Sequence, residues 1–128
     1  MSWEPMPTIE DVQSYEGFVY RITELKTGLM YYGIKKFKKR IRRKPLKGKK
    51  RVRIDYVESD WKTYNTSSPE LSERLAVAPE SYKKEIVRLC TTTTEMKAYE
   101  AYVQLSEYFN GNWDKLINQV INLRLRIR

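Results

Sequence analysis

The chain contains no histidine among its 128 residues. That absence excludes Ser-His-Asp and Cys-His catalysis, HExxH metal sites and any histidine acting as a general base. A single cysteine, Cys90, cannot form an internal disulfide and makes a zinc site nearly impossible. Any chemistry must therefore use tyrosine, lysine, arginine, aspartate or glutamate, and hard oxygen ligands favour magnesium or a similar cation.

The chain also lacks a hydrophobic run of membrane-spanning length, and its first residues lack the apolar segment of a signal peptide. Together with the single cysteine, this predicts a reducing, cytoplasmic setting and no membrane partner. The length and a hydrophobic content of 41% suit one domain with a modest core. Because Pro5 and Pro7 interrupt any periodicity, we expect an N-terminal arm over residues 1–14 that is irregular apart from a turn of helix near residues 8–12. We expect this arm to lie across a single domain formed by residues 15–128.

Acidic side chains are absent from residues 35–53, a stretch that holds 13 of the 25 lysines and arginines. The rest of the chain has 12 basic and 16 acidic residues, so the positive field is local. Pro45 and Gly48 predict a long solvated loop instead of a regular element. A soluble surface or a localisation segment could also look like this, but the lack of interspersed acids favours a surface that contacts phosphates. The candidate contacts in this basic loop are Lys36, Lys38, Lys39, Arg42, Arg43, Lys44, Lys47, Lys49, Lys50, Arg51 and Arg53.

Two tyrosine-bearing segments precede the basic loop. Bulky and polar residues alternate over residues 17–23 and the β character resumes over residues 29–35, with turn-forming residues between them, which predicts a β-hairpin. Residues at comparable distances from a hairpin turn face each other, so Tyr20 and Tyr31 can lie close together with converging hydroxyls. The alternative is that both are simply good strand formers in a chain with ten tyrosines.

The remaining elements follow from capping signals and periodicity. Residues 67–77 predict a short helix that begins with a Ser-Ser-Pro-Glu capping box, and residues 82–90 predict a third strand. A second capping box at residues 92–95 opens a helix to about Phe109, on which Glu100 is either a solvated edge residue or a metal ligand. Residues 112–128 have helical spacing, although the last six alternate like a strand. The predicted fold class is α/β of the α+β type: a small three-stranded, mainly antiparallel sheet flanked by helices.

Three short motifs occur in a recognisable order. Residues 18–20 (Phe-Val-Tyr) and 31–33 (Tyr-Tyr-Gly) place their key tyrosines 11 positions apart, and residues 60–68 read Asp-Trp-Lys-Thr-Tyr-Asn-Thr-Ser-Ser. The chain thereby resembles the GIY-YIG nuclease superfamily, and the third motif is similar to the W-x-x-Y-x-T-S-S segment of its small bacteriophage members. The resemblance covers about residues 17–110 and implies the GIY-YIG fold.

The resemblance implies hydrolysis of a phosphodiester with one divalent cation, Mg²⁺ or Mn²⁺, held chiefly by a helix carboxylate that is best matched by Glu100. Tyr20 or Tyr31 would be the general base or would orient the attacking water. A tyrosine with a free pKa near 10 needs neighbouring cations or a metal for that task.

The implied catalytic cation departs from the usual family pattern. Most members carry an arginine in a helix after the second motif, and the phage pattern has one two residues after the glycine, where this chain has Lys35. Lysine keeps the positive charge but loses the bidentate fork of arginine. Arg40 and Arg42 are alternative candidates for the cation that stabilises the transition state. Within the third motif, the candidate DNA contacts are Lys62, Tyr64, Ser67 and Ser68.

The leading hypothesis is a phage-encoded, magnesium-dependent DNA endonuclease in the host cytoplasm, with specificity supplied by DNA structure or by a phage protein partner. The first alternative is a non-catalytic nucleic-acid-binding accessory of a replication, transcription or packaging complex. A structural or assembly protein that touches the packaged genome is a further alternative. The sequence leaves the oligomeric state open.

Overall fold

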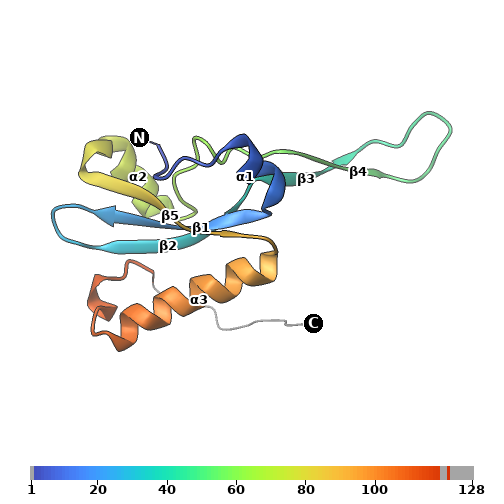
Figure 1. The fold of residues 1–128 in the computed structure, drawn as a ribbon. Helices are drawn as coiled ribbons and strands as arrows, with labels where there is room; N and C mark the ends of the chain where they lie inside the picture. The colour runs from blue at the N-terminus through green and yellow to red at the C-terminus, as the bar shows by residue number, and fades with distance from the viewer. Residues whose placement is uncertain (1, 119–120, 122–128) are drawn as a thin grey trace.

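The computed structural model describes residues 2–118 and residue 121 (Figure 1). Its centre is an antiparallel sheet of three strands in the order β2-β1-β5, formed by β1 (Gly17–Glu24), β2 (Met30–Lys36) and β5 (Tyr82–Cys90). The predicted hairpin, the predicted third strand and the α+β fold class are therefore confirmed. β1 is the central strand, and successive side chains of a strand point to opposite faces. Both faces of β1 carry apolar residues, and each face is covered by a hydrophobic cluster.

Helices lie on opposite sides of this sheet (Figure 1). The N-terminal arm, with α1 (Ile9–Ser14), lies on one side together with α2 (Pro69–Val77) and the short η1 (Pro79–Ser81). The long α3 (Thr93–Phe109) covers the other side. The sequence therefore folds into two hydrophobic clusters, one on each face of β1.

The face of the sheet that the N-terminal arm covers, which we call the arm face, carries the aromatic cluster. The Trp3 indole donates a hydrogen bond to the Trp61 carbonyl at 2.6 Å, and its ring lies 5.1 Å from Phe18 in an edge-on arrangement. This contact between residues 58 positions apart ties the N-terminal arm to the loop after β4 (Arg53–Glu58). The buried members of this cluster are Trp3, Phe18, Tyr20, Ile22, Phe37, Trp61, Leu71, Leu75 and Tyr82.

α3 begins where its capping signal predicts. The Thr92 hydroxyl accepts a hydrogen bond from the Glu95 backbone N–H at 3.0 Å, and the Glu95 carboxylate accepts one from the Thr91 N–H at 2.7 Å. Met96 and Val103 face the sheet and pack with Val19. At α2, by contrast, Ser68 caps the Leu71 N–H and no reciprocal acidic bond forms, so the predicted capping box is only half present.

The prediction of a wholly irregular basic loop is wrong. Residues 38–43 form β3 (Lys38–Arg43), which pairs antiparallel with β4 (Arg53–Glu58) in a separate two-stranded sheet. We call these strands and the turn between them the arm ribbon, and Figure 1 shows it projecting from the body of the molecule. Cations tolerate this arrangement because alternate side chains point to opposite faces of a strand and reach solvent. The partner strand β4 begins at the last residue of the basic run and continues beyond it. The basic run alone therefore did not indicate strand pairing.

The predicted C-terminal helix is also wrong over the residues that the structure describes. After α3 the chain forms only the short η2 (Trp113–Lys115), and Leu116 then bridges to Met30. The Asn118 side chain accepts from the Tyr32 N–H and donates to the Tyr32 carbonyl, both at 2.9 Å. This segment satisfies part of the free edge of β2, which a helix at the same place would leave open. The alternating residues 123–128 lie outside the described residues.

In the part of the chain that the structure covers, every helix is too short or too polar to cross a membrane.

Candidate active site

The sheet register brings the two motif tyrosines together. Tyr20 pairs with Gly33 and Tyr31 pairs with Ile22, so both tyrosines lie on the arm face, diagonally across the hairpin. Their ring centroids are 6.3 Å apart. The proximity that the spacing predicted is therefore confirmed, and the strand pairing is its cause.

The two tyrosines differ in their surroundings. Tyr20 is fully buried, and its hydroxyl has no hydrogen-bond partner among the described residues. Burial, followed by the neighbouring Tyr64 and Tyr31, raises the pKa of the Tyr20 hydroxyl well above its usual value. Tyr20 therefore stays neutral and serves as a packing residue, which makes it a poor general base.

Tyr31 is only partly buried and reaches the surface. Its hydroxyl lies 2.9 Å from the Ser67 hydroxyl, and either oxygen can be the donor. Ser67 directly precedes the N-cap of α2, where Ser68 accepts a hydrogen bond from Leu71. The start of α2 thus orients Tyr31, and of the two tyrosines Tyr31 has the accessible hydroxyl.

Lys35 lies on the same face as Tyr31. Its ammonium forms an ion pair with Asp60 at 2.7 Å and lies 4.0 Å from the centre of the Tyr64 ring. Hydrogen bonding from Lys35 lowers the pKa of the Asp60 carboxyl, so this acid is ionised at neutral pH. The third sequence motif, residues 60–68, therefore surrounds Lys35 and Tyr31, although the sequence assigned no role to Asp60.

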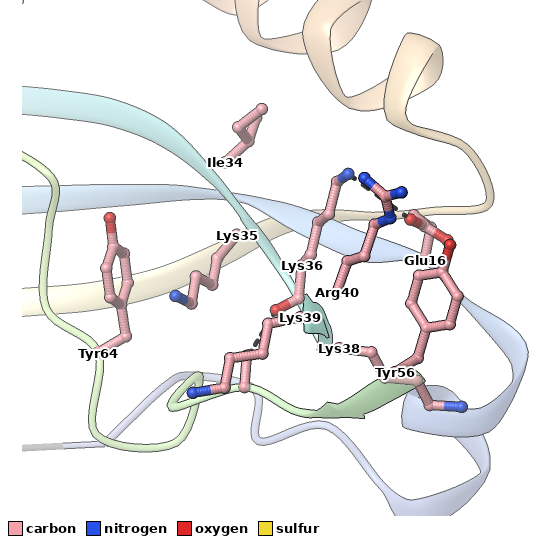
Figure 2. A pocket seen from close by; sticks show the side chains of 10 residues that line it. Glu16, Ile34, Lys35, Lys36, Lys38, Lys39, Arg40, Tyr56 and Tyr64 are labelled. Atoms are coloured by element: carbon pink, nitrogen blue, oxygen red, sulfur yellow. Dashed lines mark hydrogen bonds and ion pairs between the residues drawn. The ribbon is translucent and has the colours of Figure 1, made fainter. Parts of the chain in front are cut away.

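A cavity of about 750 Å³ lies where β2 meets the arm ribbon. Figure 2 shows Lys35 beside Tyr64, whereas Ile34 points the other way, toward α3. The cavity therefore wraps around the end of β2 and takes side chains from both of its faces. Its lining residues are Glu16, Ile34, Lys35, Lys36, Lys38, Lys39, Arg40, Tyr56, Ser59 and Tyr64. With five cations and one carboxylate, this lining suits an anionic ligand.

Glu100 lies on α3, on the other face of the sheet from Tyr31 and Lys35. It follows Met96 by one helical turn, and Met96 packs against the sheet. Burial raises the pKa of the Glu100 carboxyl, and no ion pair engages this carboxylate within the described residues. The structure thus places Tyr20, Tyr31 and Lys35 on one face of the sheet and Glu100 on the other.

The described residues offer few ligands for a divalent cation. Among the residues that the structure describes, no group of three or more acidic or cysteine side chains converges. Glu100, a half-buried carboxylate with no cationic partner among the described residues, matches the way Mg²⁺ binds through one carboxylate plus substrate phosphate oxygens and water. The described residues therefore fit a single-carboxylate magnesium site completed by substrate and do not fit an all-protein site.

The predicted phosphate contacts fall into two groups. Some cations have protein partners: Lys36 pairs with Glu16 at 3.9 Å, Arg43 with Asp55 at 3.0 Å, and Lys62 with Glu58 at 3.8 Å. Arg53 on β4 is exposed and donates to the Lys44 carbonyl at 3.2 Å. The other predicted contacts in the basic stretch are exposed along β3 and the turn that follows it, and they are Lys38, Lys39, Arg42, Lys44, Lys47, Lys49, Lys50 and Arg51. The ribbon distributes these charges over about the length of one strand and its turn, away from the core.

Lys84 is a functional candidate that the sequence analysis missed. It is 1% exposed, and its ammonium donates to the Tyr64 carbonyl at 2.7 Å and to the Asn65 side chain at 3.1 Å. The ammonium also lies 4.1 Å from the centre of the Trp3 ring. Burial lowers the pKa of Lys84 to about 8. The alternation of β5 could have indicated that Lys84 is buried. Lys84 shares a face of the strand with Tyr82 and Ile86, which belong to the arm-face cluster.

No curated protein and no solved structure matches the chain. The family model described as "Putative endonuclease segE, GIY-YIG domain" matches residues 3–112, which include the hairpin, the arm ribbon, the third motif and α3. This match spans most of the chain, and the protein therefore belongs to the GIY-YIG family of putative segE endonucleases.

Proposed function

We propose that this protein is a phage-encoded, metal-dependent DNA endonuclease that acts in the host cytoplasm. The observation that carries the proposal is that an oriented tyrosine hydroxyl, Tyr31, and Lys35 lie on one face of β2, with Lys35 lining a strongly cationic cavity. Phosphodiester hydrolysis needs an oriented water and a group that stabilises negative charge on the phosphate. Family membership supports the same reaction.

Each residue has a separate role in this proposal. Tyr31, held by Ser67, orients or deprotonates the attacking water. Lys35 stabilises the phosphate charge, and a phosphate that reaches it replaces Asp60 as its partner. Arg40 lines the same cavity and is the second cation available. Glu100 would hold the divalent cation, which, when bound, lowers the pKa of a water and neutralises developing charge.

The first test is a nicking assay on supercoiled plasmid with wild type, Glu100→Gln and Tyr31→Phe, in magnesium or in chelator. We expect wild type to nick in magnesium only, and both variants to lose at least a hundredfold in rate. Tyr102→Phe is the matched control, because Tyr102 is 61% exposed and lies on α3, which covers the face of the sheet opposite Tyr31. Nicking by Glu100→Gln at the wild-type rate would refute the metal assignment.

A second candidate function has its own observation. Lys35 is already paired with Asp60, and Glu100 lies across the sheet from Tyr31, an arrangement that suits a domain that binds nucleic acid without cutting it. The same assay separates the two. Equal retardation of DNA by wild type and Glu100→Gln, without nicking by either, would favour the binding module.

A further inference from the structure

The two faces of the arm ribbon differ in charge pairing. In an antiparallel pair, residues directly opposite each other share a face. Arg40 lies opposite Tyr56 and Arg42 lies opposite Ile54, so these four residues occupy one face. We call it the open face.

On the other face, which we call the closed face, both arginines are engaged within the ribbon, whereas Lys39 has no ion pair among the described residues. Arg43 is paired with Asp55 at 3.0 Å, and Arg53 donates to the Lys44 carbonyl at 3.2 Å. On the open face, Arg40 and Arg42 have neither ion pair nor hydrogen bond within the described part of the chain, and Tyr56 is 62% exposed. Unpaired guanidinium groups beside an exposed aromatic ring are typical of a ligand-binding surface.

The open face continues into the candidate active site. Arg40 and Tyr56 line the same cavity as Lys35 and Tyr64. Figure 2 shows Arg40 and Tyr56 on the ribbon side of this cavity, with Lys35 and Tyr64 at the opposite end. A polyanion held by the open face is therefore led to Lys35.

The dimensions of the ribbon limit which polyanion fits. β3 spans about 17 Å at roughly 3.3 Å per residue, which is about five base-pair steps. The major groove of B-form DNA, about 12 Å wide, admits a two-stranded ribbon as it stands. The minor groove, about 6 Å wide, takes a ribbon only where the duplex is bent and widened. The major groove of A-form RNA is too deep and narrow for side chains to read. Single strands offer no groove at all.

We propose that the arm ribbon lies in the major groove of a B-form DNA duplex with its open face, Arg40, Arg42 and Tyr56, toward the DNA. This rests on the proposed nuclease function and names the surface by which that same site takes hold of its substrate. The guanidinium groups bind phosphates along the groove or guanine edges within it, and the ribbon sets the position of the backbone relative to Lys35.

The test is binding in chelator, where no cleavage occurs, to three probes of one sequence: a 24-base-pair DNA duplex, its single strands and the RNA duplex. Arg40→Gln/Arg42→Gln removes two guanidinium charges from the open face, and Arg43→Gln/Arg53→Gln removes two from the closed face. We expect the open-face pair to weaken binding of duplex DNA at least tenfold more than the closed-face pair does. We also expect the wild-type preference for duplex DNA over both other probes to collapse in the open-face pair.

A second measurement locates the groove without depending on affinity. Dimethyl sulfate methylates guanine N7 in the major groove and adenine N3 in the minor groove. We expect wild type to protect N7 and the open-face pair to lose that protection, with N3 unaffected in both. Equal losses from the two double variants, equal binding of RNA duplex, or protection of N3 would each overturn the proposal.

The outcomes also separate this proposal from the nuclease assignment. If wild type nicks plasmid in a magnesium- and Glu100-dependent way while both double variants bind alike, the nuclease stands and the groove assignment fails. If the open-face pair alone loses duplex binding but wild type never nicks, the groove assignment stands and the nuclease fails.

Discussion

At the residue scale, Gly33 shows why the second motif ends in glycine. A Cβ on Gly33 would overlap the Tyr20 ring and hydroxyl, which lie directly across the hairpin. We predict that Gly33→Ala lowers the free energy of unfolding by about 1–3 kcal/mol, the usual range for overpacking a core. Urea denaturation measures the change. The double variant Gly33→Ala/Tyr20→Leu should recover part of the loss, and a fully stable Gly33→Ala would contradict this packing.

The buried Tyr20 hydroxyl leads to a prediction about the stability and activity of Tyr20→Phe. Because it is buried without a partner, Tyr20→Phe removes a desolvated polar atom and should leave the protein equally stable or slightly more stable. The raised pKa of Tyr20 further predicts that Tyr20→Phe keeps most of the nicking activity, in contrast to Tyr31→Phe. Melting temperature and nicking rate of the two variants are compared side by side. A Tyr20→Phe variant as inactive as Tyr31→Phe would make Tyr20 the general base after all.

Glu100 gives a stability prediction with a definite sign. Its carboxyl pKa is raised in the folded state, so the unfolded state ionises more readily and wild type becomes less stable as pH rises through the folded-state value. We predict that Glu100→Gln is more stable than wild type at pH 7 in chelator, and that this advantage shrinks toward pH 4. Thermal melts at both pH values provide the measurement. Magnesium should narrow the difference at pH 7 by stabilising only the wild type.

At the element scale, Lys84 joins β5 to the loop that holds Ser67. We predict that Lys84→Met costs about 1–3 kcal/mol of stability, because it leaves the buried Tyr64 carbonyl without its donor. It should also slow nicking by loosening the contact between Ser67 and Tyr31. The matched control is Lys83→Met. Lys83 is the neighbour of Lys84 in β5, but its side chain is exposed and forms only long ion pairs with Glu4 and Glu85. Equal effects of the two substitutions on stability and nicking would remove Lys84 from this role.

The lowered pKa of Lys84 also predicts how the free energy of unfolding changes with pH. Its folded pKa of about 8 lies below the ordinary lysine value of 10.5, so the cost of burying the charge is fully present below pH 8. Between these values the unfolded state binds more protons than the folded state, and stability should rise with pH. Urea titrations at pH 7.5 and 9.5 should show this rise in wild type and in Lys83→Met, and a smaller rise in Lys84→Met.

The elements themselves were unequally predictable. The hairpin, β5 and α3 carry local signals, namely alternation over residues 17–23 and a hydroxyl at Thr92, and each formed where expected. β3 needed a partner strand beyond the basic run, and residues 116–118 needed the free edge of β2. Pairing of distant segments outweighed the helical spacing there, because an unsatisfied strand edge costs more than a short helix gains.

At the scale of the whole molecule, charge is concentrated in the arm ribbon. The chain has a net charge of +9, and without residues 35–53 it would have −4. If about half of the 13 cations of this stretch contact phosphates, the affinity for duplex DNA should fall roughly a thousandfold between 50 and 200 mM salt. Anisotropy titrations across this range test it. An affinity that does not change with salt would mean that the ribbon does not hold the DNA backbone.

The sequence by itself determined the chemistry available, the order of the local elements and the family resemblance. The missing histidine left tyrosine, lysine, arginine and carboxylate as reactive groups, and local periodicity depends only on neighbouring residues. The tertiary structure decided which candidates meet. Tyr31 and Lys35 share a face with Asp60 and Ser67, Glu100 lies across the sheet, and Lys84 is buried beneath the loop. Such contacts join residues far apart in the chain, so they depend on sheet register and packing, which local pattern does not contain.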